Sequence, residues 1–281
     1  MRTLPMPPQA AADVVATCIG GFADPGLQDR LQMIAPLLAA AAANYDQLAR
    51  VQSLHQVVRS ANVGTVTRLE LEALYSQQMS ATNGVARFIY SALRNASPNG
   101  KCPLCGIGTV TVLDHHLPKA RYPNLSVCPY NLVPACDFCN TAKRARFPTS
   151  AEEQTIHPYY DDYTQQQWIF AYLDIAGPPV LVFYVNAPAD WPQIARLRAK
   201  RHFDVVKLGV SYTSNANDDL IALRNHLTTI AATKGIASVQ AYLVDEQTRY
   251  ATRINCWQHV MFQTLAANSW FIDGGYLNIP Q

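Results

Sequence analysis

Residues 101–146 read KCPLCGIGTVTVLDHHLPKARYPNLSVCPYNLVPACDFCNTAKRAR and contain two C-x2-C pairs, Cys102 with Cys105 and Cys136 with Cys139. Each pair can present two thiolates from one tight turn, and two such turns complete the tetrahedron that Zn²⁺ forms with four sulfurs. The segment has too few hydrophobic residues to form a core of its own, so a bound metal would be needed to stabilise its fold. The spacing therefore predicts a zinc site. A redox C-x-x-C is the alternative, but it would be expected beside a βαβ pattern, which is missing here.

A four-sulfur site leaves no open position on the zinc, so this ion is expected to be a structural clamp and not a catalyst. Catalytic groups should then lie in the loop that the clamp closes, residues 106–135, or immediately beyond it. Cys18, Cys128 and Cys256 have no pairing partner and are expected to be small core residues.

Length and composition describe a folded protein with a large core. The chain has 281 residues, of which 49% are hydrophobic, and its net charge of +2 is too small to indicate a partner. Prolines and Asp13 interrupt the apolar residues near the N-terminus, and no window approaches the roughly 18 apolar residues of a membrane span. We therefore expect a soluble, cytoplasmic protein with no membrane association. Seven cysteines, an odd number, favour thiolate ligands over a disulfide framework.

The N-terminal region, residues 1–100, is predicted to be helical. Apolar residues recur at helical spacing within 27–95, Pro36 is expected to kink or start a helix, and SPNG at 97–100 is a clear break. We interpret this region as a helical arm that packs on the next segment.

The C-terminal region, residues 149–281, is predicted to mix strands and helices. Two aromatic and β-branched runs separated by AGPP predict a β-hairpin within 168–185. Helices are expected over 191–209, 217–235 and 238–267. The expected fold is therefore α+β and mainly helical, with a metal-organised module at 101–148 inserted between the two flanking regions.

A polar cluster follows a short predicted strand within the loop. The stretch TVTVLDHHLPK alternates and ends in Asp114, His115 and His116, and neighbouring side chains on a strand point to opposite faces, so one of them should reach a site. After the second cysteine pair, DFCNTAKRAR can form a helix with Asp137 near its start.

The combined pattern C-x2-C, D-H-x-x-P and N-L-x-x-x-C-x2-C-N-x-x-K, over about residues 102–143, resembles the HNH nucleases. The resemblance implies the ββα-metal fold, in which a β-hairpin and one helix hold a single divalent ion, often beside a four-cysteine zinc. It also implies an endonuclease that hydrolyses phosphodiester bonds of DNA. It says little about the remaining chain.

Carried over position by position, the resemblance implies that His115 is the general base, and Asn131 braces the loop and helps to orient it. Asp114 and Asn140 would be the protein ligands of the catalytic ion. Asn140 stands where many members have His, and an amide is a weaker ligand than imidazole for soft transition metals, which favours Mg²⁺ or Mn²⁺.

The chemistry accounts for these residue types. A neutral imidazole, with an ordinary pKa of about 6.5, can take a proton from water near pH 7, and a cation can stabilise the charge that develops on the phosphate. Basic side chains would then hold the nucleic acid. The candidates are Lys119, Arg121, Lys143, Arg144 and Arg146.

Two histidines keep two interpretations each. His116 is either a partly buried histidine bonded to backbone, or a second base or phosphate contact. His157, in IHPYYDDY at 156–163, belongs either to a structural turn and cap, or to a group with Asp161 and Asp162 that approaches the ion.

The helical lead before CPLC and the HPYYDD string are similar to the HNH nucleases of Septu-type antiphage systems, which would imply an ATPase partner protein. The rival function is a zinc-organised DNA-binding or adaptor module that does not cleave. A second rival is an RNase with the same site, since metal and base would attack either backbone.

Overall fold

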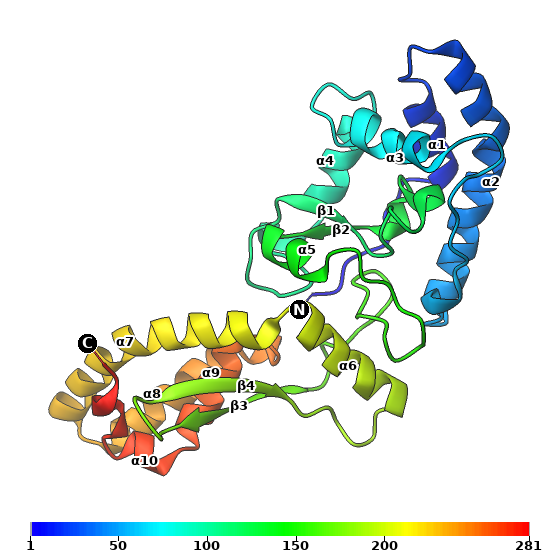
Figure 1. Cartoon of the computed structure of the whole chain (residues 1–281). Coiled ribbons are helices and arrows are strands. Elements are labelled where there is room, and N and C mark those ends of the chain that lie inside the picture. Colours follow the sequence, from blue (N-terminus) through cyan, green and yellow to red (C-terminus); the bar gives the residue numbers. More distant parts are fainter. Residues whose placement is uncertain (1, 281) are drawn as a thin grey trace. The chain divides into compact units, whose positions relative to one another are not determined.

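The computed structural model describes residues 2–280 and divides into two compact units (Figure 1). The N-terminal unit spans Arg2–Asp162, and the C-terminal unit begins at Tyr163. Both combine helices with one small antiparallel sheet of two strands, so the fold is α+β and mainly helical. Of the helices described between residues 2 and 280, none combines the length and the hydropathy that crossing a membrane requires.

The N-terminal unit opens with a series of helices. They are α1 (Ala11–Ile19), α2 (Pro25–Arg50), η1 (Leu54–Gln56), α3 (Arg68–Ala73), the π-helical η2 (Leu74–Met79), α4 (Arg87–Asn95) and η3 (Pro98–Gly100). Asp24 begins α2, because its side chain accepts a hydrogen bond from the Gly26 amide (3.0 Å) and Pro25 fits the first turn. Pro36 lies inside α2 and does not start it.

Two short strands and one helix follow. The strands β1 (Val112–His115) and β2 (Leu132–Ala135) pair antiparallel, with His115 opposite Leu132. The helix α5 (Asp137–Lys143) begins directly after β2 and packs against β1, and Figure 1 shows α4 and α5 beside the strand pair. Between the strands lie η4 (Pro123–Leu125) and η5 (Pro129–Asn131).

One hydrophobic core joins the early helices to the strand pair. Leu113 and Leu132 from the strands are buried in the same cluster as Leu71, Tyr75 and Leu93 from the helical region. The helical arm is thus a packing partner of the strand pair, and the compact unit extends beyond the 101–148 segment in both directions.

The C-terminal unit contains the predicted hairpin, β3 (Ile169–Asp174) with β4 (Val180–Val185). Its helices are α6 (Gln193–Val205), α7 (Leu208–Lys234), α8 (Ala237–Arg249), η6 (Ala251–Arg253), α9 (Trp257–Ala266), α10 (Ser269–Ile272) and η7 (Gly275–Asn278). The single helix expected over 238–267 was wrong in its continuity. The chain breaks between α8 and α9, where the Cys256 side chain accepts from the His259 amide and starts a new helix.

Candidate functional site

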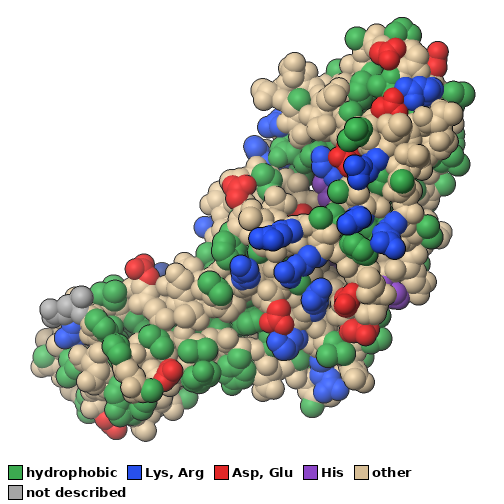
Figure 2. Space-filling view, viewed as in Figure 1, with side chains coloured by type: hydrophobic (Ala, Val, Ile, Leu, Met, Phe, Trp, Pro, Cys, Tyr) green, Lys and Arg blue, Asp and Glu red, His purple; other side chains and the backbone are tan. Residues whose placement is uncertain are grey.

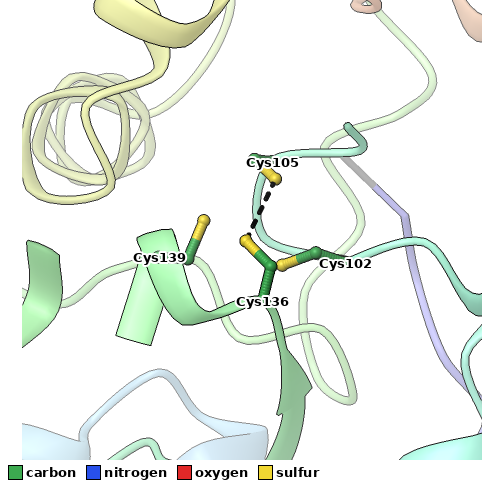
Figure 3. A group of neighbouring side chains, drawn as sticks. All are labelled: Cys102, Cys105, Cys136 and Cys139. Atoms are coloured by element: carbon green, nitrogen blue, oxygen red, sulfur yellow. Dashed lines mark hydrogen bonds between the residues drawn. The ribbon is translucent and has the colours of Figure 1, made fainter. Parts of the chain in front are cut away.

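Four cysteine sulfurs meet at the end of the strand pair. Cys102 and Cys105 come from the turn before β1, Cys136 follows β2, and Cys139 lies in α5; Figure 3 shows their side chains converging. All four are buried, their Sγ atoms lie within 4.8 Å of one another, and none forms a disulfide. The Cys105 and Cys136 sulfurs are 3.9 Å apart, close to the roughly 3.8 Å that a tetrahedron with Zn–S bonds of about 2.3 Å requires. The cluster can hold a zinc ion.

In the turn that carries Cys102 and Cys105, two glycines let the backbone lie close to the cysteine sulfurs. The Gly106 amide donates to the Cys102 carbonyl (2.7 Å), and Gly106 adopts φ +75°, which favours glycine. The Gly108 amide donates to the Cys105 sulfur (3.4 Å). A Cβ on Gly108 would lie only 2.6 Å from the Cys136 sulfur, so a side chain there would displace a member of the cluster.

Asp114, at the end of β1, is buried and ion-paired. The Lys143 ammonium, from the last turn of α5, lies 3.2 Å from one Asp114 carboxylate oxygen and 3.1 Å from the other. The Lys143 side chain is only 5% exposed and that of Asp114 only 7%. Lys143 also donates to the His115 carbonyl (2.7 Å). Burial raises the pKa of Asp114 above its ordinary value, and Lys143 opposes that rise.

His115 is buried, and its ring is fixed from two sides. Its Nε2 lies 2.8 Å from the Ser126 carbonyl oxygen, and its ring meets the edge of Tyr75 with centroids 4.5 Å apart. Only a protonated Nε2 can donate to a carbonyl, so the lone pair of the neutral ring is on Nδ1. Burial lowers the pKa of His115 to about 3, with nearby lysines adding to the effect. The imidazole is therefore neutral near pH 7.

The carbonyl that orients His115 is itself held by the helical region. The Ser126 hydroxyl donates to the Leu71 carbonyl in α3 (2.6 Å), one turn before the π-helical η2 that carries Tyr75. Such π-helical turns are frequent at functional sites. Sequence reasoning named neither Ser126 nor Tyr75 as a site residue, because only the fold brings residues 71–75 to the strand pair.

Asn131 and Asn140 hold different positions. The Asn131 side chain is fully buried, accepts from the Leu117 amide (2.7 Å) and donates to the Leu117 carbonyl (2.9 Å), so it ties down the loop just after His115. Asn140 is half-buried in α5, three residues before Lys143 and therefore on the same helix face. Among the described hydrogen bonds, none joins the Asn140 and Asp114 side chains.

The predicted nucleic-acid contacts divide into two groups. Arg121, Arg144 and Arg146 are exposed, and Lys119 is half-exposed with its ammonium 5.3 Å from the centre of the Tyr75 ring. Figure 2 shows Lys and Arg side chains gathered on the face of the N-terminal unit where α5 lies. Lys143 differs from the expectation, because its ammonium is buried against Asp114 and is not presented to solvent.

His116 and His157 are buried together, with ring centroids 4.2 Å apart. His157 Nε2 lies 2.9 Å from the Tyr45 hydroxyl, and its backbone amide donates to Asp161 (2.7 Å). The second contact is that of a capped turn. The same turn reaches the strand pair, because the Tyr159 hydroxyl donates to the Leu132 carbonyl (2.8 Å).

A comparison with known proteins found one relative. The protein is 29% identical to protein ea31 of Escherichia phage lambda, in an alignment that covers 98% of this chain and all of the relative. The similarity therefore includes both compact units. No family model matches the chain, and no solved structure matches it.

Proposed function

We propose that this protein is a metal-dependent endonuclease of the HNH type that hydrolyses phosphodiester bonds of DNA. One observation carries the proposal: Asp114 and His115 are consecutive residues at one end of a strand pair that is followed at once by α5, with four cysteine sulfurs at the other end of the same strands. A carboxylate and a neutral imidazole in one rigid place are the groups that metal-assisted phosphodiester hydrolysis needs.

His115 is the proposed general base. The Ser126 carbonyl keeps the proton on Nε2, and the Tyr75 ring limits rotation, so Nδ1 is left to accept a proton from the attacking water. A pKa of about 3 keeps the ring unprotonated at neutral pH but also makes it a weak proton acceptor, so the negative charge of a bound phosphate would have to raise this pKa for efficient catalysis. Asn131 would preserve this geometry by holding the backbone after His115.

Two metal ions belong to the proposal. A zinc ion on the four cysteines would be structural, since four sulfurs complete its coordination. Asp114 and Asn140 offer hard oxygen ligands that suit Mg²⁺ or Mn²⁺, together with water and the phosphate. When bound, such a cation would stabilise negative charge on the phosphate oxygens. Lys143 already contacts the Asp114 carboxylate, so the cation would have to share this carboxylate with the ammonium or displace it.

The Asp114–Lys143 ion pair also favours a second candidate, a zinc-organised DNA-binding module that does not cleave. In that case Lys143 is the permanent partner of the carboxylate, and Asp114 is a structural residue. An ATPase partner, inferred only from the resemblance to antiphage nucleases, stays a prediction.

The deciding experiment incubates purified, zinc-loaded protein with supercoiled plasmid and Mg²⁺ or Mn²⁺. The His115→Ala variant tests the base, and His226→Ala, an exposed histidine in α7, is the matched control. Cleavage by the parent and by His226→Ala, lost with His115→Ala and with EDTA, is the expected result. Equal DNA binding by all three without cleavage would instead identify the binding module. A parallel single-stranded RNA substrate separates a DNase from an RNase.

A further inference from the structure

An arginine-lined groove lies beside the candidate site, in the N-terminal unit. Its volume is about 560 Å³, and its walls come from the loop that contains Arg59 and Ser60, from Arg68 at the start of α3, and from Ala120 and Arg121. Among the described residues that line it, none carries a carboxylate. Two of these arginines, Arg59 and Arg68, lie outside the segment to which the sequence assigned nucleic-acid binding.

The arginines are held in place and remain accessible. The Arg59 and Arg121 guanidinium groups lie 5.2 Å and 6.0 Å from the centre of the same Phe147 ring. Arg68 is 53% exposed, and its Nε is 3.7 Å from the Glu72 carboxylate, a long surface contact that competes weakly with a ligand. Stacking on an aromatic ring reduces the freedom that an arginine loses on binding, so the groove is organised before a ligand arrives.

The loop that carries Arg59 is fastened to the loop that carries Arg121. The Ser60 hydroxyl donates to the Asn124 side chain (3.0 Å) in η4, only three residues after Arg121. The two walls therefore belong to one connected surface.

The groove is close to the candidate base. Arg121 is six positions after His115 in the sequence, which limits the distance between their Cα atoms to about 20 Å, or about six base-pair steps of a DNA strand. Lys119 lies between them, over the Tyr75 ring that contacts His115. A nucleic acid whose cleaved bond lies at His115 would thus present its neighbouring phosphates to the groove.

We propose that this groove binds the phosphate backbone of the nucleic acid on one side of the cleaved bond, through Arg59, Arg68 and Arg121. The proposal rests on the proposed function and adds a contact surface from the helical region. A guanidinium group can bind a phosphate with two parallel hydrogen bonds, and phosphate contacts carry no base information, so these contacts would position the strand without selecting sequence.

The test measures the affinity of the full-length His115→Ala protein for a fluorescent 20-base-pair duplex, at several salt concentrations. The same duplex is titrated with a chain that also carries Arg59→Ala and Arg68→Ala. If each guanidinium neutralises one phosphate, the slope of log affinity against log salt falls by about 1.8, and affinity in 0.1 M salt falls about 60-fold. Arg59→Lys with Arg68→Lys keeps the charge and should keep most of the slope.

The matched control is Arg249→Ala with Arg253→Ala. These two exposed arginines lie over the Tyr250 ring in the C-terminal unit, so the control removes the same charge and, as with Arg59, an arginine–ring contact. Zinc content and thermal melting should be equal in both pairs. If the groove variant binds within twofold of the control and with the same slope, the groove proposal is overturned. Cleavage by the parent protein, which retains His115, is measured separately. If the groove variant binds like the control but the parent cleaves, only the groove proposal is refuted. If the protein neither binds nor cleaves DNA, both proposals are refuted.

Discussion

Replacing Lys143 with methionine should strongly destabilise the N-terminal unit, although lysine is ordinarily a surface residue. Methionine keeps much of the length and apolar volume but removes the ammonium that contacts both Asp114 oxygens and the His115 carbonyl. Asp114 would then be a buried carboxylate without a counter-charge. The variant therefore isolates the electrostatic role of Lys143 from its packing.

The expected loss follows from the burial of the pair. Removing one partner of a buried ion pair costs about 3–5 kcal/mol, because the remaining charge is left uncompensated. The lost hydrogen bond to the His115 carbonyl adds about 1 kcal/mol. Adding Asp114→Asn to Lys143→Met removes the uncompensated charge, so the double variant should recover at least 2 kcal/mol relative to Lys143→Met alone.

The assay must report on the correct unit. All the tryptophans lie in the C-terminal unit, at Trp168, Trp191, Trp257 and Trp270, so tryptophan fluorescence would miss the effect. Amide hydrogen exchange of peptides that cover β1 and β2, followed in increasing urea by mass spectrometry, measures the relevant opening free energy.

The matched control is Arg50→Met in the same unit. Arg50 pairs with Asp46 on the surface of α2 at 2.9 Å and is 60% exposed, so its removal should cost no more than about 0.5 kcal/mol. If Lys143→Met destabilises β1 and β2 by less than 1 kcal/mol more than Arg50→Met does, the buried pair is not the electrostatic support described above.

Three further predictions concern the metal cluster and α3. Cys105→Ser should lose about one equivalent of zinc by elemental analysis and lower the melting temperature of the N-terminal unit, whereas Cys18→Ser, buried elsewhere, should retain the metal. Gly108→Ala should weaken zinc retention against a chelator, because its Cβ would lie 2.6 Å from a cluster sulfur, while Gly177→Ala meets no atom within 4 Å and should be neutral. Hydrogen bonds from Arg30 and from the Thr67 amide lower the pKa of Glu70 to about 2. The Glu70 carboxylate therefore stabilises α3 fully above pH 4.5 and progressively less as the pH falls toward 2. Glu70→Gln should cost about 1 kcal/mol at pH 7, and acid unfolding curves should show this difference vanish near pH 2.

Local patterns in the sequence predicted the elements that form the site. The alternation before Asp114 corresponds to β1 and the segment DFCNTAKRAR to α5, whereas β2 was expected only from the family resemblance; the hairpin over 168–185 was confirmed. The grouping of the four cysteines was also predictable, because two C-x2-C turns have few other ways to satisfy their thiolates. The single strand, the helix and each C-x2-C turn depend on neighbours within about ten residues, and the two distant turns are joined by the metal that they would share.

Contacts between distant segments could not be predicted in this way. Lys143 has the pattern of a surface cation in KRAR, and its burial depends on how α5 is rotated against β1. Tyr75 and Leu71 reach His115 and Ser126 across some forty to fifty-five positions of sequence, where periodicity carries no information. The break between α8 and α9 was missed because no Gly or Pro marks it.

The cysteine cluster and the candidate active site are mechanically linked through β2 and α5. Cys136 stands between the last residue of β2 and the first residue of α5, and Cys139 fixes the first turn of that helix. The last residue of α5, Lys143, then compensates Asp114, while the other end of β2 lies opposite His115. A metal on the four sulfurs would therefore set the direction of α5 and, through Lys143, the charge beside His115, although it lies too deep among sulfurs to touch a substrate.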